Sequence, residues 1–323
     1  MSAIALRGPE RVVIHQHRRA LWSAGALALM GVAVVVAAWL WASSASDTFA
    51  GSGCSVENTV RGCGDTVRAF LDTELRFSRA VDYAGLAMMV LPACVGMFVA
   101  GPLVGRELES GTYQTSWSQS VSPARWLAAR LAVPAVLTLA GVSVLSAFSA
   151  WAWSRAKGTY YPRGDWYERE VYGAMGSAPV GYALCMLALG ALAGLLLRRT
   201  VAAMVVTVLA YVPLTMVLNR VREDLWPTVR LLGGDRPGEH AWWIDSGMLT
   251  ASGKALYWRD CEGPDVSVTP FACMRGLKGA TEFTDYHPAS HFWPLQLVET
   301  GILLGLAALA VALAFRVLRR RHG

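Results

Sequence analysis

Six long apolar segments alternate with polar connections along this chain of 323 residues. Each segment is almost free of charge and close to the roughly 20 residues that a helix needs to cross a bilayer. The segments cover residues of about 21–42, 83–104, 131–153, 178–197, 200–219 and 295–315. The first has too long an apolar core for a cleaved signal peptide, and five more spans follow it. The pattern predicts an all-α polytopic membrane protein with six transmembrane helices.

The composition agrees with this interpretation. Hydrophobic residues make up 54% of the chain and charged residues 16%, and the mean hydropathy is +0.38. Soluble domains carry about 25% charged residues, so a chain this poor in charge favours a membrane location.

Arginines mark one side of the predicted bundle. They lie before the first span, between the second and third, between the fourth and fifth, and after the last. With six spans, these four segments share one side, and because short basic segments stay in the cytoplasm, both termini are expected there. The residues are Arg7, Arg11, Arg18, Arg19, Arg106, Arg125, Arg130, Arg198, Arg199, Arg316, Arg319, Arg320 and Arg321. The sequence pI of about 9.1 is explained by these topology signals, so we expect no nucleic-acid partner.

The three connections on the other side, 43–82, 154–177 and 220–294, are predicted to be extracytoplasmic loops. They contain four of the six cysteines: Cys54, Cys63, Cys261 and Cys273. Their spacing does not match a zinc knuckle, and an extracytoplasmic location permits disulfides. We predict the two local pairs, Cys54 with Cys63 and Cys261 with Cys273, each stabilising the fold by about 3 kcal/mol. Free thiols are the alternative.

The first and third of these loops have patterns of their own. Residues 65–82 place apolar side chains at helical spacing, which predicts an amphipathic helix on the outer membrane surface that leads into the second span. The third loop is rich in tryptophan. Tryptophan favours the membrane interface, but these rings could equally form the small core of a cysteine-stapled cap.

The candidate catalytic and metal-binding patterns fail in detail. The segment GMLTASGKA at 247–255 has the wrong glycine spacing for a phosphate-binding loop, and Ala255 replaces the Ser or Thr that would hold magnesium. His287 and His291 are four residues apart and near two carboxylates, which allows a metal site, but Pro288 disfavours the helix that would align both rings. The chain is interpreted as non-catalytic on its own, with no cofactor or metal.

The connection between the second and third spans is longer than a turn requires. Gly111 can end the second helix, Thr112 can cap a short helix over about 113–120, and Ser122 with Pro123 can start the third span. Tyr113 and Trp117 would share one face of the short helix, with Val121 one turn further on. This exposed aromatic face could be a docking surface, or the helix could lie in the membrane interface with Trp117 among the headgroups.

The segment GPLVGRELESGTYQTSWSQSVSPARWLAARL resembles the same region of the type-2 permeases of bacterial ABC transporters. The resemblance lies in an acidic pair, a Gly-Thr, a short helix, and a Ser followed by Arg at the next span. YHPASHFWPLQLVETGI resembles the start of the last span in actinobacterial members. ERVVIHQHRRALW resembles the amphipathic helix that precedes the first span in this family. Residues 1–20 are therefore interpreted as a cytoplasmic amphipathic segment, and 21–323 as the six-span transmembrane domain.

The resemblance implies a permease subunit of an ATP-driven exporter in the bacterial plasma membrane. ATP and Mg would be bound by a separate ABC ATPase subunit, and a second permease would complete a homo- or heterodimer. The cargo would be an amphipathic drug, peptide or lipid. The residues expected to couple to the ATPase are Glu107, Glu109, Gly111, Thr112, Tyr113, Trp117 and Val121. A channel or sensor protein working without an ATPase remains an alternative, as does a membrane enzyme.

Glu299 is a charged residue within the last predicted span. Charged groups inside spans are rare and often functional, but Glu299 lies only five residues past Pro294, roughly 7–8 Å along a helix. It could therefore be an interfacial carboxylate that reaches water. Alternatively it faces the bundle or the translocation path, where Gln296, one turn back, could share its hydrogen bonds.

Overall fold

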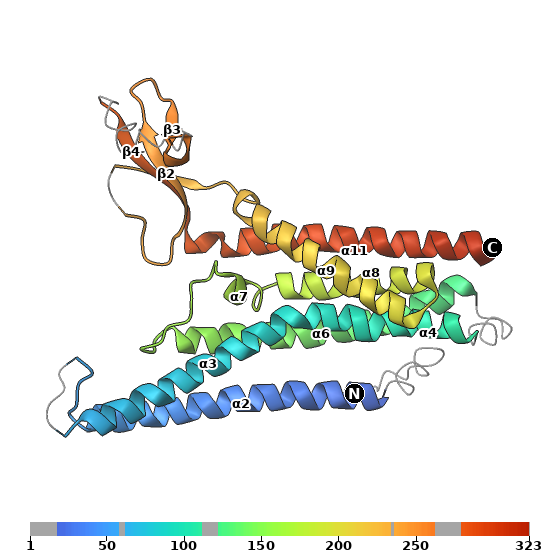
Figure 1. The fold of residues 1–323 in the computed structure, drawn as a ribbon, viewed down its shortest axis with the longest axis horizontal. Helices are drawn as coiled ribbons and strands as arrows, with labels where there is room; N and C mark the ends of the chain where they lie inside the picture. Colours follow the sequence, from blue (N-terminus) through green and yellow to red (C-terminus); the bar gives the residue numbers. More distant parts are fainter. Residues whose placement is uncertain (1–17, 58–61, 112–121, 234–235, 262–278, 323) are drawn as a thin grey trace, which may run out of the picture.

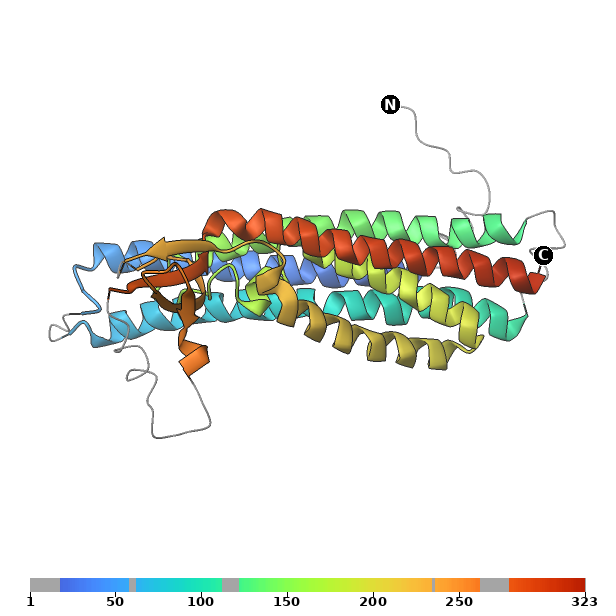
Figure 2. The ribbon, with the colours of Figure 1, turned by 90° about the horizontal axis from the view of Figure 1, so that it is seen from above.

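The computed structural model describes residues 18–57, 62–111, 122–233, 236–261 and 279–322. Within this part, six helices are long and apolar enough to cross a membrane, as the sequence predicted. They run side by side as an elongated bundle (Figure 1; Figure 2). They are α2 (Arg18–Gly51), α3 (Gly64–Cys94) continued by η1 (Val95–Ala100) and α4 (Gly101–Ser110), α6 (Pro123–Ala156), α8 (Ala178–Leu197), α9 (Thr200–Val221) and α11 (Phe292–His322).

The two ends of the bundle differ in what they carry. The start of α2 and the end of α11 point toward the same end of the bundle, which we call the terminal end (Figure 1). The other end, the sheet end, carries a β-sheet, the short helix α7 (Arg169–Tyr172) and the connection between α2 and α3. The 3₁₀ turns η2 (Arg222–Asp224), η3 (Trp258–Cys261) and η4 (Ala289–His291) complete the described elements.

The second span differs most from its predicted form. The segment predicted to lie on the membrane surface instead continues the span, so that Gly64–Ser110 forms one helical run of 47 residues. Such a run is about 70 Å long, whereas the hydrocarbon core of a bilayer is about 30 Å thick. The predicted helix is therefore present and leads into the second span, but it extends beyond the span's length in line with it, so the prediction that it lies along the membrane surface was wrong. The apolar positions of this segment pack instead on α2 and α6, where Phe77 and Val81 are buried.

The ends of the helices around the second connection follow the predicted signals. Gly111 terminates α4 in the left-handed conformation, with φ of 73°. Ser122 caps α6 by accepting a hydrogen bond from the Arg125 amide, and Pro123 occupies the first turn. Left-handed backbone favours glycine, and a first-turn proline has no amide hydrogen that needs a partner.

Helix α8 forms the centre of the bundle. It packs against α3, α4, α6, α9 and α11, and most of its residues are buried. Small residues allow this close packing: a Cβ added at Gly190 would lie 2.5 Å from the carbonyl oxygen of Gly96 in η1. The π-helical η1 follows Pro92 in α3, which has no amide hydrogen for the helical ladder. Helix α8 is thus the element on which every other span except α2 packs.

The third connection contains a four-stranded antiparallel sheet, which the sequence analysis did not predict. Its strands are β1 (Val229–Leu232), β2 (Trp242–Leu249), β3 (Ala255–Tyr257) and β4 (Thr281–His287), in the order β1-β4-β2-β3. In the register, Phe283 of β4 pairs with Leu232 and Gly247, and its ring is buried against Tyr257. The all-α class therefore describes the membrane helices, to which this loop adds a small β-layer.

The tryptophans of this loop differ in how deeply they are packed. Trp242 belongs to a packed cap, since its ring stacks on Tyr167 at 5.6 Å and meets Trp166 edge-on. Trp243 and Trp293, in contrast, are 55% and 57% exposed. The Trp166 indole donates a hydrogen bond to the carbonyl of His240 at 2.8 Å, which joins the second and third loops into one layer.

One predicted disulfide is confirmed. Cys54 and Cys63 are bonded, with an S–S distance of 2.03 Å, and close the connection between α2 and α3. Cys261 is also disulfide-bonded, but Cys273 lies outside the described residues, so this pairing stays a prediction. Cys94 and Cys185 are free, and Cys185 is a buried packing residue of α8.

Candidate functional site

At the terminal end, Glu107 joins α4 to the start of α6. Its carboxylate forms an ion pair with Arg130 and accepts a hydrogen bond from the Trp126 indole at 3.0 Å. The Glu107 and Arg130 side chains are only 16% and 11% exposed. Partial burial removes competing water, so this contact holds α4 against α6 more firmly than a surface ion pair would.

The second predicted carboxylate, Glu109, joins α4 to the start of α9. It accepts hydrogen bonds from the Thr200 amide at 2.9 Å and the Thr200 hydroxyl at 2.7 Å, and so caps a helix other than its own. The backbones approach closely here, because a Cβ added at Gly105 would lie 3.2 Å from the Thr200 Cα. We call Glu107, Glu109 and their three partners the α4 clamp. It binds the last turns of α4 to the first turns of two other spans.

Four of the residues expected to couple to an ATPase fall outside the described part of the chain: Thr112, Tyr113, Trp117 and Val121. The short helix at 113–120 therefore stays a prediction. That segment comes directly after the end of α4, which contains Glu107 and Glu109 and ends at Gly111, and it is followed by Ser122. The structure thus describes both anchors of the segment.

At the sheet end, Glu299 lies in the interior and not at a wet interface. Its side chain is 0% exposed. It binds the Arg222 Nε at 3.1 Å and accepts a hydrogen bond from the Tyr182 hydroxyl at 2.6 Å. Of the two interpretations of Glu299, the structure favours the one in which it faces the bundle.

Gln296, one turn earlier, uses its amide group on backbone atoms rather than on Glu299. Its oxygen accepts from the Ala178 amide at 2.7 Å, and its nitrogen donates to the Tyr172 carbonyl at 3.0 Å. The Arg222 guanidinium lies 3.9 Å from the centre of the Tyr172 ring. The Tyr172 hydroxyl is buried near Glu299. We call Glu299, Arg222, Tyr182, Tyr172 and Gln296 the buried polar cluster.

Sequence reasoning found Glu299 and Gln296 but missed their partners. Arg222 follows the fifth predicted span and was assigned to a loop, although it lies one helical turn beyond Leu218 on a buried side of α9. Tyr182 and Tyr211 are tyrosines inside apolar spans, and each donates a hydrogen bond, Tyr182 to Glu299 and Tyr211 to the Met89 carbonyl. A tyrosine inside an apolar span is a signal that sequence reasoning could have used, because its buried hydroxyl needs a hydrogen-bond acceptor on a neighbouring helix.

The two histidines of the allowed metal site contact each other directly. The Nδ1 atoms of His287 and His291 are 2.9 Å apart, and His287 Nε2 lies 3.0 Å from the Glu223 carbonyl. A carbonyl can only accept, so His287 carries its hydrogen on Nε2 and accepts from His291. Burial lowers the pKa of His287 below its ordinary value, in agreement with a neutral ring. Asp285 is bound to Arg230 at 2.7 Å, and the described residues contain no group of three metal-ligating side chains.

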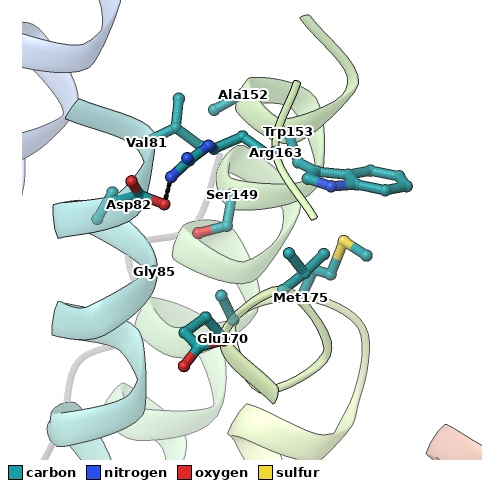
Figure 3. Close-up of a pocket in the computed structure, with 12 residues that line it drawn as sticks. Val81, Asp82, Gly85, Ser149, Ala152, Trp153, Arg163, Glu170 and Met175 are labelled. Carbon is teal, nitrogen blue, oxygen red and sulfur yellow. Dashed lines mark ion pairs between the residues drawn. The ribbon is translucent and has the colours of Figure 1, made fainter. Parts of the chain in front are cut away.

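A pocket lies between α3, α6 and α7 (Figure 3). Its cavity volume of about 30 Å³ corresponds to one water molecule. Arg163 reaches across it to form an ion pair with Asp82 of α3, while Glu170 lines the opposite part (Figure 3). The Arg163 Nε is buried without a hydrogen-bond partner in the described residues, and burial lowers the pKa of its guanidinium. The ion pair between Arg163 and Asp82 thus joins the second predicted extracytoplasmic loop to α3.

These features define a multi-pass membrane protein whose polar groups connect its spans at both ends. A family model described as ABC-2 membrane transporter related matches residues 24–222, which is more than half of the chain. The chain therefore belongs to the ABC-2 membrane transporter related family. Comparisons with curated proteins and with solved structures find no match.

Proposed function

We propose that this chain is the membrane-spanning subunit of an ATP-driven ABC exporter in the bacterial plasma membrane. A separate ABC ATPase would bind ATP and Mg, and two permease chains, identical or different, would enclose the path. The cargo would be an amphipathic drug, peptide or lipid. Family membership supports the permease role, and the arginines of the terminal end support a cytoplasmic location for that end.

The observation that carries the proposal is the α4 clamp. A partner that pushes on residues 112–121 would act on α4 and α6, which flank this segment in the chain. Glu107 links α4 to α6, and Glu109 links α4 to α9. A displacement of the segment would therefore move three spans together instead of bending one loop. This is what an ATPase at the terminal end would need in order to move the membrane helices.

The first experiment is copurification of the tagged full chain from its source membrane, with identification of the bound proteins. We expect an ATPase with nucleotide-binding motifs in stoichiometric amount. Trp117→Glu should leave the chain in the membrane but weaken this association and abolish ATP-dependent transport in proteoliposomes. Trp243→Glu, at an exposed position of the sheet end, is the matched control.

Purification of an active chain with no ATPase would favour the channel or sensor alternative. A structure of the complex with Trp117 in lipid, away from the ATPase, would contradict the proposed docking face.

A further inference from the structure

A second pocket lies at the sheet end, between α3, α8, α9 and the start of η2. We call it the α3–α9 pocket. Met88, Met89 and Pro92 of α3 form an apolar wall, and Asn219, Arg222 and Arg169 supply polar groups. The cavity volume is about 30 Å³, so it admits one water-sized group, such as a single oxygen of a larger oxyanion.

Arg222 brings unused hydrogen-bond donors to this pocket. Its residue is 5% exposed, and its Nε is bound to Glu299. A guanidinium carries four further N–H donors on its two terminal nitrogens. Within the described part of the chain these donors have no acceptor, although Tyr172 covers one face of the group. Neither terminal nitrogen is among the buried unpartnered atoms of the described residues, so both keep some exposure to the pocket and can bind an acceptor that enters it.

The charges around the pocket favour an anion as that acceptor. Glu299 already balances the charge of Arg222. Arg169 lines the same pocket, and none of its contacts with described residues is an ion pair. The nearest acids in sequence are directed elsewhere: Glu223 pairs with Arg220 at 3.9 Å, and Glu170 lines the pocket of Figure 3. The α3–α9 pocket therefore keeps a net positive charge.

The surroundings of the pocket indicate what else the ligand contains. Exposed apolar side chains lie next to the lining residues on both helices: Leu86 and Val90 on α3, and Val212 and Met216 on α9. A headgroup that places one oxygen in the pocket could thus continue into an apolar tail along these helices. Arginine binds planar or tetrahedral oxyanions through paired hydrogen bonds.

We propose that the α3–α9 pocket binds the oxyanion head of an anionic amphiphile, a carboxylate or a phosphate, through Arg222 and Arg169, with the apolar tail against α3 and α9. The ligand is either a resident anionic lipid or the exported cargo. The second case rests on the proposed export function, whereas binding itself does not.

Native mass spectrometry of the full chain in nanodiscs tests the site. The nanodiscs contain equal amounts of palmitoyl-oleoyl phosphatidylglycerol and phosphatidylcholine. We expect the wild type to retain the anionic lipid about tenfold over the zwitterionic one, which is the effect of one charge-assisted pair. Arg169→Gln should reduce this preference several-fold. Arg79→Gln, which removes an exposed arginine of α3 outside the pocket, should leave it unchanged.

A second variant removes Arg222 without leaving Glu299 charged and unpaired. In the double variant Arg222→Gln, Glu299→Gln, the preference should disappear. If this variant does not fold, Arg169→Gln decides. The proposal is overturned if the pocket variants retain the wild-type preference for the anionic lipid. It is also overturned if inorganic phosphate at millimolar concentration binds the wild type as tightly as the anionic lipid does, because the apolar tail would then contribute nothing.

The two sources of the ligand are separated by adding the copurified ATPase and ATP. Loss of the bound amphiphile during turnover identifies it as cargo, and retention identifies it as a resident lipid; the site stands in both cases. Failure to find any ATPase would contradict the proposed function alone, because the binding measurement uses only this chain.

Discussion

The two ends of the bundle use carboxylates in different ways. At the terminal end, Glu109 caps α9 from an exposed position and Glu107 holds Arg130 in a partly buried one. At the sheet end, Glu299 of α11 holds Arg222 with both side chains at or below 6% exposure. An exposed contact can exchange with water at little cost, whereas separating a buried pair leaves an uncompensated charge.

The two ends should therefore differ in how much their carboxylates contribute to stability and to the transmission of motion. We expect the α4 clamp to transmit motion between α4, α6 and α9 while adding less to stability, because its Glu109 contact is exposed. The buried polar cluster joins α11 to α8 and to the end of α9 and should stay intact during such motion. We therefore expect substitutions at the sheet end to change the free energy of unfolding, and substitutions at the terminal end to change transport.

The largest effect is expected for Arg222→Met. It leaves the Glu299 carboxylate buried without its cation, which should destabilise the protein by about 3–5 kcal/mol. Thermal unfolding of the purified protein in detergent measures this loss. Adding Glu299→Gln removes the unpaired charge and should recover much of the stability. A double variant as unstable as the single one would show that the pair does not hold this end together.

A smaller loss of stability is expected for Glu107→Gln at the terminal end. The amide can still accept from Trp126 but cannot pair with the charge of Arg130, so the cost should be about 1–2 kcal/mol. Proteoliposome assays should show less transport per ATP hydrolysed. A larger destabilisation than that of Arg222→Met would reverse the comparison between the ends.

Acid should weaken the sheet end through His287. Burial lowers its pKa below the ordinary value of 6.5, so the unfolded chain binds a proton more readily than the folded one. Stability is therefore lost as the pH falls below about 6.5 and through the folded pKa. A protonated Nδ1 could no longer accept from His291. Unfolding temperatures measured from pH 7.5 to 5 should fall less in His287→Gln, and an unchanged slope would contradict this role.

The smallest change in stability is expected for Glu109→Ala, because Glu109 is exposed. The unfolding temperature should stay close to that of the wild type. Transport driven by ATP should nevertheless decrease, since α4 would no longer move α9 through Thr200. Glu282→Ala, an exposed carboxylate of β4, is the control and should leave transport unchanged. Normal transport in Glu109→Ala would remove this half of the α4 clamp from the proposed mechanism.

The predictable part of the fold depends on signals that are local in sequence. The six apolar segments, the left-handed end at Gly111, the cap at Ser122 and the disulfide of Cys54 with Cys63 all follow from neighbouring residues. The sheet of the third loop was missed because one of its two inner strands, β4, comes last in the chain and pairs with strands far from it in sequence. Pairing of β4 with β1 joins residues more than 50 positions apart, which no local pattern reports.

The site shows the same division. The sequence by itself determined that Glu299 and Gln296 are polar groups within an apolar span, and that Glu107 and Glu109 precede a connection of unusual length. Only the tertiary structure decided their partners, since Arg222, Tyr182 and Thr200 come from other helices. Burial is a property of packing: a carboxylate that begins a span can reach water or face the core, and here the packing of α8, α9 and α11 around Glu299 excludes water from it.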